Sequence, residues 1–181
     1  MNDAPRAARI GVVTASDRAS AGVYKDESGP AIEAYLRRTL TSEFTVLRRI
    51  VPDGFESVRD TLIALVDDEG CDLVLTTGGT GPSARDLTPE ATLAAAPRVY
   101  SGFGELMRQV SLREVPTAIL SRQIAAQRGA CLIVNLPGKP GSIVTCLDAV
   151  FPAIPYCLDV MGAARLETNP SEIIAFRPKG A

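Results

Sequence analysis

A stretch rich in glycine and threonine, Thr77 to Gly81, is the feature of this chain best suited to bind a ligand. It contains Gly78, Gly79, Thr80 and Gly81 and follows the apolar run Leu73 to Thr77. Glycines at the end of a strand let backbone N–H groups approach a ligand closely and line up as an anion-binding concavity. Three glycines within four residues cost chain entropy unless they are used, so the pattern favours a phosphate- or carboxylate-binding loop over a plain turn.

Two aspartates are candidates for the chemistry beside that loop. Asp53 lies in the turn sequence Pro52-Asp53-Gly54, and Asp86 lies just ahead of a predicted helix. Each has an ordinary explanation, the first as a turn residue and the second as a favourable charge near a helix N-terminus. Placed together after neighbouring strands, however, the two carboxylates suit a magnesium–nucleotide site, because Mg²⁺ takes one or two carboxylates plus phosphate oxygens and water.

Other polar residues are expected at the same edge of the sheet. Ser16 and Asp17 follow the first apolar run, and Asn135, Pro137 and Gly138 end the last one. The Asn135 amide can donate and accept hydrogen bonds, which suits the edge of a heterocycle. A turn that ends a strand explains Pro137 and Gly138 equally well.

The chain of 181 residues contains no histidine. A Ser-His-Asp or Cys-His nucleophile, a His-ligated metal and an imidazole base are therefore excluded. Nineteen Lys and Arg against 21 Asp and Glu give a formal charge of −2, which predicts neither a nucleic acid nor a membrane surface as partner. Chemistry must come from carboxylates, Lys, Arg, hydroxyls, Cys, backbone amides or a bound metal ion.

Several alternative sites are disfavoured. The sequence from Gly79 to Ala84 satisfies G-x-G-x-x-G/A, but the next helix is expected only at Thr88, which argues against a dinucleotide site. The four cysteines form no C-x-x-C pair and are expected to be buried hydrophobes in a reduced, cytoplasmic protein. No apolar signal core begins the chain, and no continuous apolar run reaches the roughly 18 residues of a membrane span.

Short apolar runs alternate with segments of helical spacing along the chain. Runs at 10–15, 73–77 and 131–136 read as buried parallel strands covered on both faces, and 45–51 is a further predicted strand. Between them, helical patterns occupy 29–40, 56–69, the segment from 88, 103–110 and 140–150. This order predicts an α/β fold with a single-domain, doubly wound, mostly parallel sheet and helices on both faces. We assign residues 1–8 as a flexible N-terminus, 9–166 as the domain and 167–181 as a C-terminal tail. Ligands of such sheets bind beyond the carboxyl ends of the strands, where the residues above lie.

The loops together resemble those of the molybdopterin adenylyltransferases, the MogA family that includes the plant and animal G domains. The likeness extends from about Arg9 to Phe176, and Thr-Gly-Gly-Thr-Gly followed by Arg-Asp-x-Thr-Pro-Glu is its most specific part. The segments that carry it are Ile10–Gly22, Val51–Asp53, Leu75–Glu90, Gly102–Gly104, Leu120–Arg122 and Ile133–Pro140.

This resemblance implies a nucleotidyltransferase of molybdenum cofactor biosynthesis, with a MogA/MoaB-like fold. It would transfer AMP from ATP to molybdopterin with Mg²⁺, giving adenylyl-molybdopterin and pyrophosphate. It also implies a homotrimer and contact with the molybdenum-insertion enzyme. The family's essential aspartates fall on Asp53 and Asp86, which would also be the magnesium ligands, while Gly54 replaces an acid common in relatives. The substrate-binding residues expected are Ser16, Asp17, Gly78, Gly79, Thr80, Gly81, Ser111, Asn135, Pro137 and Gly138.

Two other functions stay open from the sequence. One is a module of the same fold that binds or carries molybdopterin without catalysis. The other is a nucleotide hydrolase of the CinA type, which shares a Gly-Gly-Thr-Gly loop. The continuation Arg-Asp-Leu-Thr-Pro-Glu and the strand end Asn-Leu-Pro-Gly favour the adenylyltransferase over the hydrolase, whereas pyrophosphate release from ATP in the presence of the pterin would separate it from the carrier module.

Overall fold

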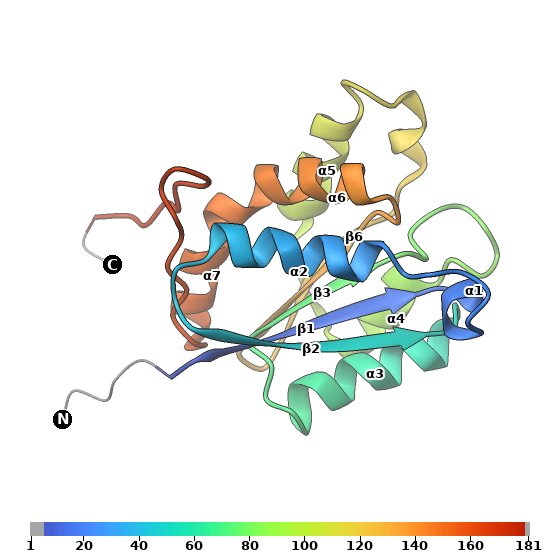
Figure 1. Cartoon of the computed structure of the whole chain (residues 1–181), viewed down its shortest axis with the longest axis horizontal. Helices are drawn as coiled ribbons and strands as arrows, with labels where there is room; N and C mark the ends of the chain where they lie inside the picture. Colours follow the sequence, from blue (N-terminus) through green and yellow to red (C-terminus); the bar gives the residue numbers. More distant parts are fainter. Residues whose placement is uncertain (1–5, 180–181) are drawn as a thin grey trace.

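A six-stranded sheet with helices on both faces makes up the computed structural model, which describes residues 6–179 (Figure 1). The strands lie in the order β2-β1-β3-β6-β5-β4. The first four are parallel, and β5 and β4 add an antiparallel edge, so the predicted mostly parallel α/β sheet is confirmed. The strands are β1 (Ala8–Ala15), β2 (Phe44–Val51), β3 (Leu73–Thr77), β4 (Arg98–Val99), β5 (Ala125–Arg128) and β6 (Cys131–Leu136).

The helices divide between the two faces of the sheet, and each group covers its own hydrophobic core. One core packs α2, α5, α6 and α7 on the sheet, and the other packs α3 and α4 on the opposite face; Figure 1 shows α2 and α6 above the strands and α3 below. The helices are α1 (Asp17–Ser20), α2 (Ser28–Thr39), α3 (Phe55–Asp67), α4 (Thr88–Ala95), α5 (Ser101–Ser111), α6 (Pro140–Val150) and α7 (Ile154–Met161), with 3₁₀ turns η1 (Pro116–Leu120) and η2 (Phe151–Ala153).

Burial on both faces explains the continuous apolar runs of the central strands. Every residue of β3 and of β6 is buried. The short strands β4 and β5 lacked such a run and were not predicted. Their sequences, Arg-Val and Ala-Ala-Gln-Arg, contain a single β-branched residue between them, and their pairing is set by neighbouring strands rather than by local pattern.

The helical stretch Pro140–Met161 corrects one expectation. By length and composition it is apolar enough to cross a membrane, although the sequence holds no long uninterrupted apolar run. It consists of α6, η2 and α7, and Leu147, Phe151 and Leu158 are fully buried in the core under these helices. Packing against the sheet therefore accounts for its apolar character, as in the core helix of a globular protein.

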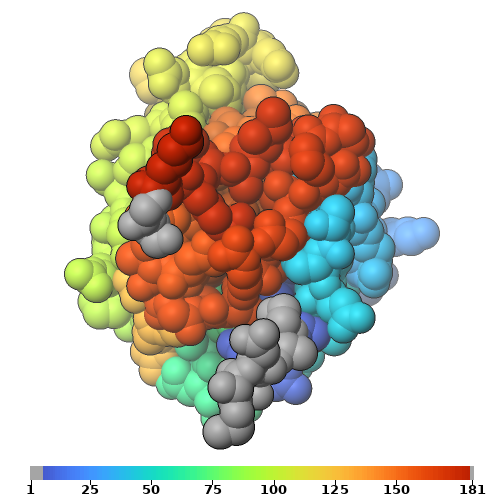
Figure 2. All heavy atoms as spheres, turned by 90° about the vertical axis from the view of Figure 1, so that its left-hand side faces the viewer, coloured from blue at the N-terminus to red at the C-terminus, as the bar shows by residue number. Residues whose placement is uncertain are grey.

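Residues that follow position 166 pack along the side of the sheet opposite the carboxyl ends of its parallel strands. Thr168 forms a β-bridge with Leu40, the Asn169 N–H donates to the Thr39 carbonyl at 2.7 Å, and Ile173 joins the core. Figure 2 shows the orange and red C-terminal residues covering most of this face, beside the cyan residues of α2 and the turn after it. The opposite edge, where β1, β2, β3 and β6 end, is left for ligands.

Candidate active site

Backbone geometry makes glycine necessary in the loop after β3. Gly78 and Gly79 have φ of +92° and +65°, a region that L side chains rarely adopt. A Cβ on Gly78 would lie 2.2 Å from the Ala15 carbonyl oxygen, and one on Gly79 would lie 2.3 Å from Thr88 Oγ1. The first residue of α4 fastens the loop, since the Thr88 N–H donates to the Gly79 carbonyl and its hydroxyl donates to the Gly78 carbonyl, both at 3.0 Å.

A cavity of about 250 Å³ lies where the parallel strands end. It brings together the two predicted aspartates, which reach it from the loops after β2 and β3. The predicted Ser16, Gly78 and Gly79 also line it. Thr77, which begins the glycine- and threonine-rich stretch, lines it as well. Further lining residues that were not predicted as site residues are Thr14, Ala15, Ala19, Tyr24, Asp26 and Ser28.

Asp17 lies behind this cavity rather than in its lining. Its N–H donates to Asp53 Oδ2 at 2.9 Å, and the Asp53 N–H donates back to Asp17 Oδ1 at 3.1 Å. Arg85 donates to both carboxylate oxygens of Asp17, at 2.8 and 2.7 Å, and to the Asp53 carbonyl at 2.6 Å. These hydrogen bonds from Arg85 lower the pKa of Asp17. The predicted residue Asp17 thus holds Asp53 in place, and Arg85 binds both of them. The sequence did not predict this role of Arg85.

Asp86 is held by its own loop. The Ser83 N–H donates to Asp86 Oδ2 at 2.9 Å. A Cβ on Gly81 would lie 2.9 Å from that same oxygen, so the missing side chain leaves room for the carboxylate.

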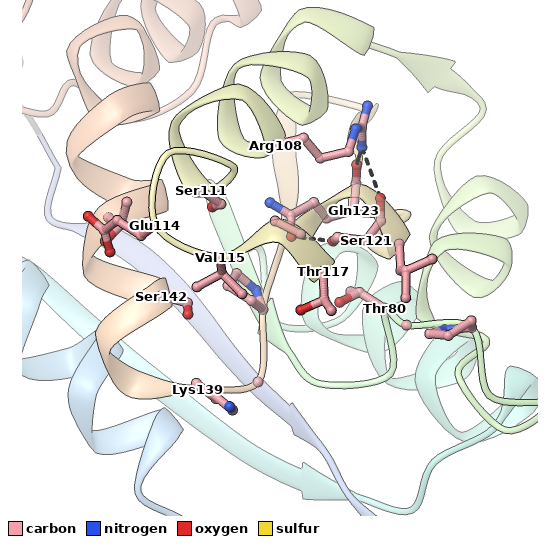
Figure 3. Close-up of a pocket in the computed structure, with 17 residues that line it drawn as sticks. Thr80, Arg108, Ser111, Glu114, Val115, Thr117, Ser121, Gln123, Lys139 and Ser142 are labelled. Atoms are coloured by element: carbon pink, nitrogen blue, oxygen red, sulfur yellow. Dashed lines mark hydrogen bonds between the residues drawn. The ribbon is translucent and has the colours of Figure 1, made fainter.

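A second cavity, of about 340 Å³, lies on the other side of the glycine loop (Figure 3). Figure 3 shows Thr80 from the loop, Ser111 at the end of α5, Gln123 ahead of β5 and Lys139 at the start of α6 around it. The predicted residues Thr80, Gly81, Ser111, Pro137 and Gly138 line this cavity, and Gly138 lines both. The loop is therefore a wall that the two cavities share.

The larger cavity has a mostly apolar lining that also carries several hydroxyl groups, two cationic side chains, Arg108 and Lys139, and one acid, Glu114. Arg108 donates to the Gln123 carbonyl at 2.9 Å, so it also braces the wall. The Gln123 side chain is buried and accepts from the Ser121 hydroxyl at 2.6 Å. Positive charge beside backbone and hydroxyl groups suits an anionic, hydrogen-bonding ligand. These residues carried no recognisable spacing in the sequence.

Asn135 is not brought together with the other predicted site residues. Its side chain is fully buried and donates to Thr76 Oγ1 at 3.1 Å and to Thr92 Oγ1 at 2.9 Å. It lines neither cavity. The expectation that its amide faces a heterocycle is therefore contradicted by this geometry, in which the amide joins β6 to β3 and α4.

The sequence and the fold match known proteins over almost the whole chain. The family model described as "Probable molybdopterin binding domain" matches residues 11–156. A molybdopterin adenylyltransferase from Helicobacter pylori is 54% identical over 170 residues, which cover 94% of this chain and 97% of that protein. The chain belongs to the molybdopterin adenylyltransferase family. The resemblance stated from its loops is thereby confirmed.

Solved structures agree with this membership. The molybdopterin biosynthesis enzyme MoaB from Thermus thermophilus superposes with a TM-score of 0.80 at 40% identity, covering 88% of this chain and 99% of that one. The CinA protein from Thermoplasma acidophilum, at 18% identity and a TM-score of 0.61 over 81% of this chain and 98% of that one, shares the fold alone. The glycine loop left open the alternative of a CinA-type hydrolase. This likeness supports a shared fold and gives no support to a shared activity.

The smaller cavity of this adenylyltransferase family member has donors that fit a magnesium ion held jointly with a substrate. Among residues 6–179, no three His, Cys, Asp or Glu side chains are grouped to bind a metal by themselves. Asp53 and Asp86 offer two hard carboxylates in one cavity beside the glycine loop. Mg²⁺ is commonly bound by one or two carboxylates, with substrate phosphates and water completing its shell.

Proposed function

We propose that this chain transfers AMP from ATP to molybdopterin, giving adenylyl-molybdopterin and pyrophosphate in a magnesium-dependent reaction. The observation that carries this proposal is the glycine loop as a shared wall, with the Asp53 and Asp86 carboxylates in one cavity and hydroxyl groups, Arg108 and Lys139 in the cavity on the other side. Two substrates held on either side of such a wall can meet at their phosphates.

In this proposal the larger cavity takes molybdopterin and the smaller one takes the phosphates of ATP. Ser111, Pro137, Gly138 and Lys139 would contact the pterin, whose terminal phosphate would point toward the loop. Ser16, Gly78 and Gly79 would bind ATP phosphate oxygens, with backbone N–H groups as donors.

The reaction needs no nucleophile from the protein. A phosphate oxygen of molybdopterin attacks the α-phosphorus of ATP and forms a new P–O bond. The bond between the α-phosphorus and the bridging oxygen breaks, and its electron pair leaves with pyrophosphate. Catalysis then consists of positioning and charge stabilisation, which a chain without histidine can provide.

Asp53 and Asp86 would hold the magnesium ion, which supplies neutralisation of phosphate charge. Asp17 and Arg85 would not contact the ion themselves; they fix the backbone and the carboxylate of Asp53, which would. We also propose that the protein is a homotrimer in the cytoplasm, as the resemblance to the family implies. We propose further that it contacts the molybdenum-insertion enzyme, because the product is the substrate for a metal insertion.

The purified protein with molybdopterin, ATP and Mg²⁺ tests the proposal, with adenylylated pterin measured by mass and pyrophosphate measured in parallel. Transfer that requires all three components supports it. Pterin binding without transfer would instead support a carrier module. ATP consumption without pterin would support a CinA-type hydrolase.

Replacing Asp86 with Asn tests the assignment of the site. We expect turnover to fall about 100-fold or more, because a charge that stabilises the transferring phosphate is lost. Molybdopterin affinity should change by less than about threefold, because Asp86 lines the other cavity. Near-normal adenylyl transfer by this variant would refute the role of Asp86.

A further inference from the structure

We propose that Arg122 is a positioning residue that fixes the loop carrying Asp86 and ties it to the wall of the larger cavity. This inference rests on the role proposed above for Asp86. Arg122 follows η1 and belongs to the sequence Leu120-Ser121-Arg122, to which the reaction as proposed gives no role.

Four contacts carry the proposal, and together they span the loop. The Arg122 backbone N–H donates to the Thr80 carbonyl at 2.9 Å, and its Nε donates to the Gly81 carbonyl at 3.1 Å. Its two terminal nitrogens donate to the Asp86 carbonyl and to the Glu90 carboxylate. One residue therefore fixes the loop before the turn, after the turn and at the first turn of α4.

The loop depends on such contacts because it buries little of its own surface. Residues 82–85 are exposed, and the Asp86 side chain is bonded within the loop only by the Ser83 N–H. Arg85 holds the outer end of the loop to Asp17 and Asp53. Arg122 holds the inner end, so the direction of the Asp86 carboxylate is set by both arginines.

A guanidinium suits this position better than an ammonium. Its donors lie in a rigid planar fork and can reach separate acceptors at once, whereas lysine offers a single nitrogen on a flexible stem. In Arg122 all three side-chain nitrogens donate, each to a different acceptor.

The residues on either side of Arg122 form part of the larger cavity. Ser121 and Gln123 both line it, and they are joined by the hydrogen bond from the Ser121 hydroxyl to the Gln123 side chain. Arg108 further braces this segment through the Gln123 carbonyl. A shift of that cavity wall must therefore move the contacts that hold Asp86, which links the pterin side of the site to the carboxylate side.

A double-mutant cycle between Arg122 and Asp86 tests the proposal, using R122Q, D86N and the two combined. We expect R122Q to lower kcat about 30-fold, because a misplaced catalytic group costs rate even when it is present, while the KM for molybdopterin stays within about threefold. If Arg122 acts through Asp86, adding R122Q to the D86N variant should lower kcat by less than about a further threefold. Arg122→Lys should recover part of kcat. Arg128→Gln is the matched control, because Arg128 also bonds a carboxylate and a carbonyl but lies away from both cavities.

Single-turnover product formation, measured by mass at high enzyme concentration, gives the rates of the slow variants. Fully additive losses, or a loss confined to KM, would overturn the positioning role while leaving the role of Asp86 intact. Near-normal turnover of D86N alone would overturn both the role of Asp86 and the positioning role of Arg122. This outcome therefore distinguishes failure of the proposed function of the site from failure of the Arg122 proposal. Thermal melting of R122Q, compared with that of R128Q, shows whether the variant folds. If it does not fold, the same double-mutant cycle is carried out with R122K in its place, and additivity of the losses in kcat is again the criterion.

Discussion

The two cavities on either side of the glycine loop differ in what holds their walls. The smaller one is built where parallel strands end, and its loop backbone is held by two hydrogen bonds from Thr88. The larger one is built partly from the segment of α5, η1 and the residues up to Gln123, where Val115 is 44% exposed and Leu120 is 50% exposed. The sheet thus fixes the side proposed for the ATP phosphates, and a peripheral segment shapes the side proposed for the pterin.

The largest effect should come from breaking the wall itself. In Gly78→Ala, the new Cβ meets the Ala15 carbonyl at a backbone φ of +92°, so the loop must move. We expect adenylyl transfer to fall by about 100-fold or more, since both cavities lose their common wall. Gly129→Ala is the control, because Gly129 also has a positive φ, of +56°, but has open space around it. It should cost only about 1–3 kcal/mol of stability and leave kcat unchanged. Equal activity losses in the two variants would contradict the argument.

A smaller effect should follow from loosening the carboxylate side. In Arg85→Gln, the donors to Asp17 and to the Asp53 carbonyl are lost, and we expect kcat/KM for ATP to fall about tenfold at neutral pH. The KM for molybdopterin should stay unchanged. Arg59→Gln, which removes the exposed pair with Asp60, is the control.

The same variant has a consequence for pH. Because Arg85 lowers the pKa of Asp17 below 3.8, the folded state favours the ionised carboxylate, and that contribution is lost as the pH falls through the lowered value. Arg85→Gln should therefore raise the pKa of Asp17 toward 3.8, as an NMR titration can measure. An unchanged pKa would show that the pair does not form in solution.

The pterin side should respond more weakly and more selectively. Lys139→Ala removes a cation from the larger cavity alone, and we expect the KM for molybdopterin to rise about fivefold with the KM for ATP unchanged. Lys179→Ala, far along the chain and exposed, provides the control. A rise in the KM for ATP instead would reverse the assignment of the two cavities.

The smallest effect on catalysis should come from Asn135. Asn135→Ala removes the amide between Thr76 and Thr92, and should destabilise the protein by about 1–3 kcal/mol while kcat and both KM values stay within about twofold. Thr92→Val removes one of these two contacts from its other end, together with the hydrogen bond from the Thr92 hydroxyl to the Thr88 carbonyl, and should also destabilise the protein in denaturant unfolding. A selective rise in the KM for molybdopterin would restore a direct ligand role for Asn135.

Sequence patterns predicted the sheet side of the site well, because local rules govern it. Apolar runs marked the buried strands β1, β3 and β6, and the loops after β2 and β3 carry Asp53, Gly78 and Asp86 by topology alone. The direction of a side chain near the end of a strand was not predictable, and Asn135 points into the protein as a result.

The peripheral segment was less predictable for a different reason. Gln123, Arg108 and Arg122 act through contacts with residues distant in sequence, which no spacing reveals. The antiparallel strands β4 and β5 are short, and their pairing depends on neighbours in the sheet, since β5 pairs with β6 and β4 pairs with β5. Long-range hydrogen bonds therefore determine the structure of this segment, and local sequence patterns do not reveal them.

The strand order also bears on how the molecule resists aggregation. A sheet that ends in β2 and β4 has two edges that could pair with another chain. At one edge β4 has two residues, too few to template a long ladder. At the other, β2 carries Arg48 and Arg49, and Arg48 is held by a hydrogen bond of 2.9 Å to the buried Asp26. Charge on one edge and brevity on the other keep the open sheet from growing beyond its own chain.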